Sequence, residues 1–267
     1  MYVPPKKRVT LPEKIAVGVI VLVIAAIVLP VSMHPRDFDN QDLCAENEKQ
    51  LALSMLEYAQ DSDGFFPPGL SKSGLGWGGE LYPYVKFRDV YSCAQDRRDV
   101  PDKHDANEYP ISYALNSNVI GHKFPVSMTN MIDNPSNTVL LFETAGSYFD
   151  PKSDDILSDP SKQHSPTGNG LDGQLRCEIG KWQGPVRYAT GAFDRPTNSD
   201  SQFSDDDVRH SGGANYAIVD GHVIWMKPED VSPGLNATNP TAPETGGLMG
   251  NAAGTQNLKY KATFSVR

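Results

Sequence analysis

The residues most suited to chemistry lie in one short segment near the C-terminal end, between His210 and His222. Two imidazoles with the carboxylate of Asp220 could form a two-histidine, one-carboxylate metal site. The same residue types suit a structural role, in which His210 and Asp220 hold a loop and a turn through hydrogen bonds to the backbone. The sequence has no hydrolase, metalloprotease, P-loop or dinucleotide-binding motif, and no histidine forms a close ligand pair with another His or Cys. We therefore expect a structural segment, with no catalytic residue and no metal ligand.

Carboxylates elsewhere are the remaining candidate ligands. Asp61 and Asp63 precede Gly64, and a second acidic run spans 205–207, but the ligand spacing of an EF-hand loop is absent. Calcium is the one cofactor that the sequence leaves open. The alternative is that these acidic segments are solvated loops that bind no ion. The formal charge of −9, from 24 basic and 33 acidic side chains, argues against a nucleic-acid partner, because phosphate binding requires clustered Lys and Arg.

Short β-type runs separated by turn residues must position the segment from His210 to His222. Asp220 and Gly221 predict a two-residue hairpin between the arms 216–219 and 222–226, with both residues at positive φ. The other expected strands are 82–87, 111–116, 138–143 and a final run, 259–267. Residues 150–207 are typical of a long polar surface insertion, and 232–257 of a loose tail, because large apolar residues are rare there.

The N-terminal part predicts a membrane anchor. Residues 15–33 carry no charge, and as a helix they would span roughly 28 Å, close to the thickness of a bilayer core. Lys and Arg precede this run, which predicts a single-pass helix of the inner membrane with a cytoplasmic N-terminus and a head in the periplasm or at the cell surface. A cleaved secretory signal and a buried helix of a soluble protein are the alternatives.

A second, amphipathic helix is expected over 40–60, with one face packed on the rest of the protein. The face expected to pack consists of Leu43, Asn47, Leu51, Met55 and Tyr58, and the face expected to point to solvent consists of Glu46, Glu48, Lys49 and Glu57.

Thr10 and Glu13 lie at the start of the first helix. They have the S/T-x-x-E spacing of a capping box, in which each side chain bonds the backbone amide of the other residue. The segment is also similar to the start of type IV prepilins, whose Glu guides subunit docking, although Arg8 stands where those proteins have Gly before the scissile bond. Thr10 and Glu13 are thus candidates for a helix cap or for subunit docking.

Several segments together resemble one family of bacterial pilin-like proteins. These proteins have a prepilin-type N-terminus and a C-terminal processing-associated domain marked by His, nine residues and Asp-Gly. Here that pattern runs from His210, through Asn215, to Asp220 and Gly221. Further similar segments are 44–51, 58–68, 81–86 with 90–93, 112–116 and 134–138.

The resemblance implies an α+β, pilin-like fold, in which a long transmembrane-plus-amphipathic N-terminal helix packs on an antiparallel β-sheet head with long loops. The expected parts are a cytoplasmic N-terminus (1–14), a transmembrane helix (15–33), an amphipathic helix (34–64), a β-rich head with the motif (65–228) and a low-complexity tail ending in a strand (229–267). The resemblance and an oxidising exterior also imply a disulfide between Cys44 and Cys93, with Cys177 free.

The implied function is that of a non-catalytic, membrane-anchored pilin-like or pseudopilin-like surface protein in a type II secretion or type IV pilus type of assembly. Its partners would be the membrane and further copies of itself or other pilin-like subunits. The alternative is an extracytoplasmic ligand-binding, metal-binding or enzymatic domain carried on a pilin-like anchor. A pocket where His210 and Asp220 converge with another polar group would favour the alternative, and a filled core would favour the first function.

Overall fold

The computed structural model describes residues 11–32, 36–69, 75–96, 109–120, 131–149, 165–171, 187–190, 209–246 and 250–267. The chain divides into two units, Met1–Asp39 and Asn40–Arg267, and we call the second unit the head domain. Most of the expected insertion at 150–207, with Cys177 in it, lies outside the described residues, as does Thr10.

The first unit contains helix α1 (Leu11–Ser32), with Glu13 in its first turn. Within the described residues, no helix combines the length and the apolar character that a membrane crossing requires. This finding contradicts the expected transmembrane helix at 15–33, and with it the membrane anchor and the inner-membrane location. The expectation relied on the absence of charged residues from 15–33. The helix that contains most of this run begins earlier, at Leu11, and also includes Glu13 and Lys14.

The head domain combines helices with a mixed β-sheet. Its helices are α2 (Arg36–Asp61, from Asn40 onward), α3 (Trp77–Val85), α4 (Ser117–Ile120) and the short 3-10 helices η1 (Arg88–Tyr91) and η3 (Pro228–Asp230). Its strands are β1 (Tyr109–Asn116), β2 (Val139–Phe149), β3 (Thr167–Gly168), β4 (Arg187–Tyr188), β5 (Ala214–Ile218), β6 (Val223–Met226), β7 (Val231–Ser232) and β8 (Ala262–Thr263).

The main sheet has the order β3-β1-β2-β5-β6, with β4 paired to β2. The pairs β1–β2, β2–β5 and β5–β6 are antiparallel, but β3 runs parallel to β1, with Leu115 opposite Thr167. The class is therefore α+β, but the expectation of an antiparallel sheet is wrong at this edge. A parallel pair needs a long connection, and the polar stretch after β2 provides that length.

Four of the expected inner strands lie at or close to β1, β2, β5 and β6, but the strand expected at 82–87 is wrong. Most of that segment belongs to α3, which ends at Val85 and is followed by Lys86 in the left-handed conformation with φ 63°. Trp77, Leu81 and Val85 recur every four residues and are all buried. This spacing places three large side chains on one helical face, and their burial outweighs the β-type composition of the segment.

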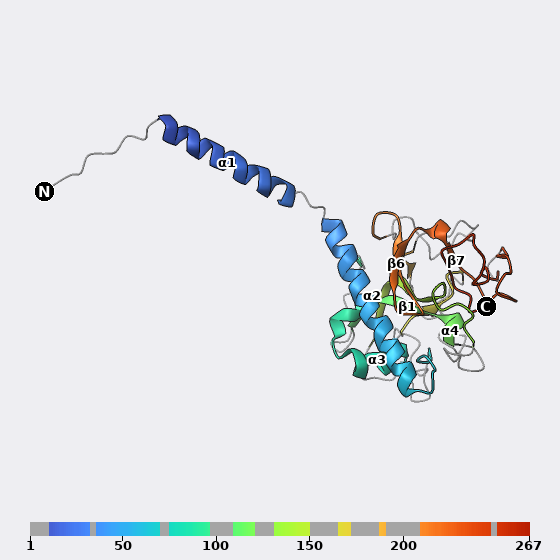
Figure 1. Ribbon diagram of the computed structural model, residues 1–267. Coiled ribbons are helices and arrows are strands. Elements are labelled where there is room, and N and C mark those ends of the chain that lie inside the picture. The colour runs from blue at the N-terminus through green and yellow to red at the C-terminus, as the bar shows by residue number, and fades with distance from the viewer. Residues whose placement is uncertain are drawn as a thin grey trace. The chain divides into compact units, whose positions relative to one another are not determined.

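Helix α2 lies across one face of the sheet (Figure 1). Leu51 and Met55 of α2 pack in the same cluster as Ile111 and Leu115 of β1 and Ala217 of β5. The packed face differs from the expected one at two positions: Leu43 is 58% exposed, and Glu48, expected in solvent, is fully buried. The residues that are at most 1% exposed are Cys44, Glu48, Leu51, Ala52, Met55 and Ala59, which follow a regular helical stripe.

The segment expected to be loose, 232–257, is packed where the structure describes it: Ser232, Ala252 and Ala253 are fully buried, and the amide of Ala253 donates to Ser232 Oγ at 2.8 Å. In the final run beyond it, Phe264 packs on the face of the sheet opposite α2. Phe264 is fully buried against Phe142 of β2, with ring centroids 5.1 Å apart. The side chains of Asn116 and Asn118 both donate to the carbonyl of Phe264, at 3.0 and 2.9 Å. Hydrogen bonds from buried amide side chains and the buried ring of Phe264 thus hold the final run, while small buried side chains pack the segment before it.

Candidate functional site

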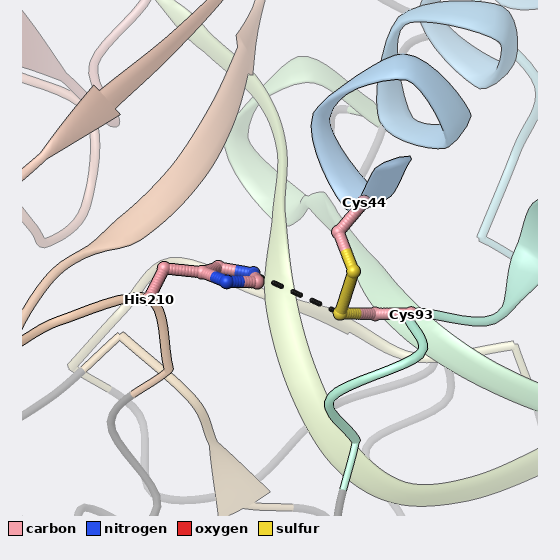
Figure 2. A group of neighbouring side chains, drawn as sticks. All are labelled: Cys44, Cys93 and His210. Atoms are coloured by element: carbon pink, nitrogen blue, oxygen red, sulfur yellow. Dashed lines mark hydrogen bonds between the residues drawn. A yellow bond between two sulfur atoms is a disulfide. The ribbon is translucent and has the colours of Figure 1, made fainter. Parts of the chain in front are cut away.

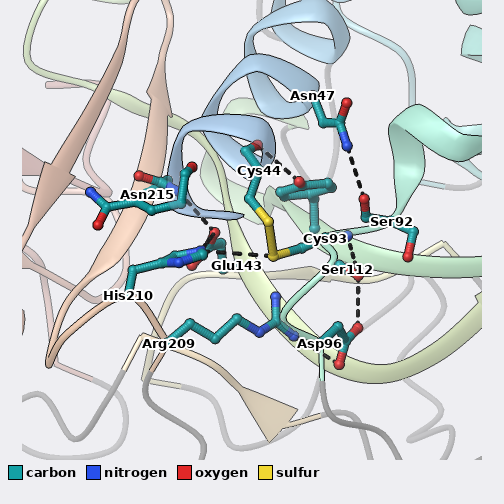
Figure 3. Close-up of a disulfide and its surroundings, with 12 residues drawn as sticks. Cys44, Asn47, Ser92, Cys93, Asp96, Ser112, Glu143, Arg209, His210 and Asn215 are labelled. Atoms are coloured by element: carbon teal, nitrogen blue, oxygen red, sulfur yellow. Dashed lines mark hydrogen bonds and ion pairs between the residues drawn. A yellow bond between two sulfur atoms is a disulfide. The ribbon is translucent and has the colours of Figure 1, made fainter. Parts of the chain in front are cut away.

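A disulfide joins α2 to the segment that follows η1. Cys44 lies on α2 and Cys93 lies just after η1, with their Cα atoms 4.9 Å apart (Figures 2 and 3). Both residues are buried. The pair is the one that the family resemblance implied. It fixes α2 at the point where the helix crosses a group of charged side chains inside the head.

His210 lies directly against this disulfide. Its Nε2 atom is 3.7 Å from Cys93 Sγ (Figure 2). The same atom is 2.8 Å from Glu143 Oε1 at the middle of β2 (Figure 3). Asn215 of β5 donates to the same carboxylate oxygen at 3.2 Å. The side chains of His210 and Glu143 are both 0% exposed. The motif histidine and the motif asparagine therefore converge on one buried carboxylate that sequence reasoning did not identify.

A buried ion pair lies beside this histidine–carboxylate contact. Arg209 contacts Asp96 at 2.9 Å, with side chains 5% and 1% exposed, and also donates to the carbonyl of Thr144 (Figure 3). Ser112 donates to Asp96 at 2.7 Å and accepts from the backbone amide of Cys93 at 2.9 Å. Through this chain of contacts, the residue before His210 is connected to the backbone of the disulfide.

Glu48 of α2 completes the buried polar cluster, by which we mean Glu48, Asp96, Glu143, Arg209, His210 and Asn215. Its Oε1 accepts from the backbone amide of Ala217 in β5 at 2.9 Å. Complete burial, and then the negative charge of Glu143, raise the pKa of Glu48 well above its usual value. Burial thus favours the protonated form of Glu48, and the side chain bridges α2 and β5.

The backbone around His210 is unusual. His210, Ser211 and Gly212 have positive φ angles of 54°, 62° and 86° in succession. Trp225 of β6 donates from Nε1 to the carbonyl of His210 at 2.8 Å, and an added Cβ at Gly213 would meet its ring at 2.5 Å. The loop before β5 is thus held in a left-handed conformation that costs free energy for residues other than glycine, and its contacts to Glu143 and Trp225 offset that cost.

The Asp-Gly end of the motif forms a tight turn after β5. Gly221 has φ 93° and donates to the carbonyl of Ile218 at 2.8 Å, while Asp220 is not at positive φ. The loop is therefore a three-residue turn with a left-handed glycine, and the predicted two-residue turn is wrong in this detail. Partial burial would raise the pKa of Asp220, but hydrogen bonds from Ser136 and His222 outweigh it and lower that pKa.

The two ends of the motif do not converge. His210 lies before β5 and Asp220 after it, and a five-residue strand separates them by roughly 16 Å. His222 pairs with Asp220 at the surface, with a side chain 48% exposed. The imagined two-histidine, one-carboxylate site is therefore not formed.

The other predicted residues are placed as follows. Glu13 lies in the first turn of α1. Asp61 accepts a hydrogen bond from Tyr84 at 3.2 Å, and the acidic run at 205–207 lies outside the described residues, so calcium binding stays a prediction. Among the described residues, one group of His, Cys, Asp and Glu atoms is close enough to share a metal ion, and it consists of Cys44, Cys93 and His210.

Comparison of the chain with protein-family models, with curated proteins and with solved structures finds no match.

Proposed function

We propose that this chain is a non-catalytic pilin-like protein, a subunit of a pilus-type or pseudopilus-type assembly, and that the segment from His210 to Gly221 is part of the framework of its head domain. The observation that carries the non-catalytic part is the complete burial of the His210 and Glu143 side chains. A general acid or base has to reach its substrate within hydrogen-bond distance. Neither side chain is accessible to a substrate in this state.

The partners of the motif residues support the same role. His210, Asn215 and Glu143 connect the loop before β5 to β2, and Gly221 fits the turn against α2, where an added Cβ would lie 3.1 Å from Leu56. Each motif residue therefore positions backbone. None of them points into a shared cleft with the other end of the motif.

The assembly part of the proposal rests on helix α1. Its large apolar side chains from Leu11 to Ile24 are between 53% and 72% exposed in the single chain. A contiguous exposed apolar surface of this kind marks an interaction site in a folded protein. We infer that the α1 helices of several pilin-like subunits pack together and cover these side chains.

Cross-linking of the full chain in the producing cells tests this assembly. The wild-type protein should give a discrete ladder of cross-linked subunits, and Ile20→Asp should abolish the ladder, because a carboxylate would be buried between helices without a partner. Leu258→Asp is the matched control, because Leu258 is an apolar residue of the head domain that is 99% exposed. A wild-type chain that stays monomeric, or a control that acts as strongly as Ile20→Asp, would refute the proposal.

A further inference from the structure

Three potential metal ligands meet inside the head domain. The Sγ atoms of Cys44 and Cys93 and a ring nitrogen of His210 all lie within 4.8 Å of one another, and all three residues are buried (Figure 2). In the disulfide the sulfur atoms carry no charge and are poor ligands. As thiolates, they would be two soft anionic donors beside an imidazole, which is a donor set that favours Zn²⁺.

The distances suit such an ion. Zinc lies about 2.3 Å from sulfur and about 2.0 to 2.1 Å from imidazole nitrogen, so a tetrahedral site separates these two donors by about 3.6 Å. Cys93 Sγ and His210 Nε2 are already 3.7 Å apart. The remaining adjustment is a separation of the two sulfurs, which breaking their bond permits.

Glu143 offers a further carboxylate donor. It is not in the group whose atoms all lie within 4.8 Å of one another, so its carboxylate has to move toward the sulfurs to share their ion. Its Oε1 lies 2.8 Å from the same Nε2, and its Oε2 has no hydrogen-bond partner among the described residues. A buried carboxylate oxygen without a partner is costly in the disulfide form, and a cation would satisfy it. Asn215, which donates to Oε1 at 3.2 Å, would hold the carboxylate in place as a neighbour of the ligand shell.

We propose that reduction of the Cys44–Cys93 disulfide creates a zinc site formed by Cys44, Cys93, His210 and Glu143. A dithiol gives two electrons and two protons to the disulfide, so that two protein thiols form and the dithiol becomes a disulfide. Zn²⁺ then displaces the two thiol protons into solution and binds both sulfurs. In the ligand form the imidazole carries its proton on Nδ1, which leaves the Nε2 lone pair for the metal. This inference does not rest on the proposed assembly function.

The test uses Co²⁺ as a spectroscopic probe for zinc. The full chain is reduced with dithiothreitol in denaturant, freed of reductant without oxygen, and refolded with Co²⁺; the unreduced chain is treated in the same way. We expect the reduced chain alone to show thiolate-to-cobalt charge-transfer absorption, to bind about one ion per chain and to release it to Zn²⁺. Circular dichroism reports whether the reduced chain has refolded.

Single variants identify the ligands. Cys44→Ser and Cys93→Ser should weaken the charge-transfer absorption. His210→Ala should lower the affinity for Co²⁺, and Glu143→Gln should lower it about 10-fold to 100-fold. Cys177→Ser is the matched control and should leave both unchanged. The proposal is overturned if the reduced wild-type chain shows no charge-transfer absorption, whether folded or not. It is also overturned if His210→Ala binds as tightly as the wild type or if Cys177→Ser loses the ion.

Discussion

Replacing His210 by alanine should destabilise the head domain, whereas replacing His222 should not. His210→Ala removes a ring that is 0% exposed from Glu143, whose carboxylate is then left with Asn215 at 3.2 Å. Removing one partner of a buried hydrogen bond costs about 1 to 3 kcal/mol, and more when the group left behind is charged. We expect a loss of about 3 kcal/mol in the free energy of unfolding.

The control histidine lies in the same segment and also contacts a carboxylate. The side chains of His222 and Asp220 are 48% and 35% exposed, so water replaces the contact and His222→Ala should cost about 0.5 kcal/mol or less. Guanidinium unfolding followed by circular dichroism measures both values. A double-mutant cycle with Glu143→Gln should give a clear coupling to His210. Equal losses for the two histidine variants, or zero coupling, would refute the structural role of His210.

Three further outcomes follow from the same contacts. Gly221→Val should lower the free energy of unfolding by about 1 to 2 kcal/mol, because φ is 93° and the added side chain meets α2, whereas Gly246→Ala, with no atom near its Cβ position, should change little in the same unfolding assay. Joint replacement of Cys44 and Cys93 by serine should lower the free energy of unfolding by about 4 kcal/mol, because the disulfide closes a loop with a sequence separation of 49. Thermal unfolding under oxidising conditions measures this loss, and an unchanged stability would contradict the prediction. Burial raises the pKa of Glu48, so the stability that the protonated side chain contributes is complete in acid and is lost as the pH rises above 4.5, the ordinary pKa of a glutamate. Glu48→Gln should therefore make the free energy of unfolding fall less steeply with pH. An unchanged slope would contradict the pKa shift.

The strands around the motif could be predicted because their signals are local. Alternating apolar residues and the Asp-Gly turn are contained within residues 214–226, and the observed β5–β6 hairpin needs no distant contact to be inferred. The extent of α3 was missed although Trp77, Leu81 and Val85 already have helical spacing. A longer window would have detected this period, since the prediction considered only the last part of the helix.

The buried charges could not be predicted in the same way. His210 and Glu143 are 67 residues apart in sequence, and no local pattern indicates which of the carboxylates the histidine meets. The spacing of Glu48 does indicate burial, because it lies four residues after Cys44 and four before Ala52, within the buried stripe of α2. Its charge favours solvent exposure instead, because acidic side chains are rarely buried without a partner. The partner of Glu48 lies on β5, far along the chain, where no local pattern indicates it.

The spacing of the motif has a physical explanation in this fold. His210 must reach Glu143 from the loop before β5, and Gly221 must turn the chain after β5 against α2. The nine residues between His210 and Asp220 contain the left-handed loop and the five-residue strand that these two positions require. Both ends also act on α2, the first through the disulfide and the second through Leu56, while Glu48 bonds the strand between them. The motif therefore sets the position of β5 relative to α2 at three points, and a change in its length would move His210 out of reach of Glu143.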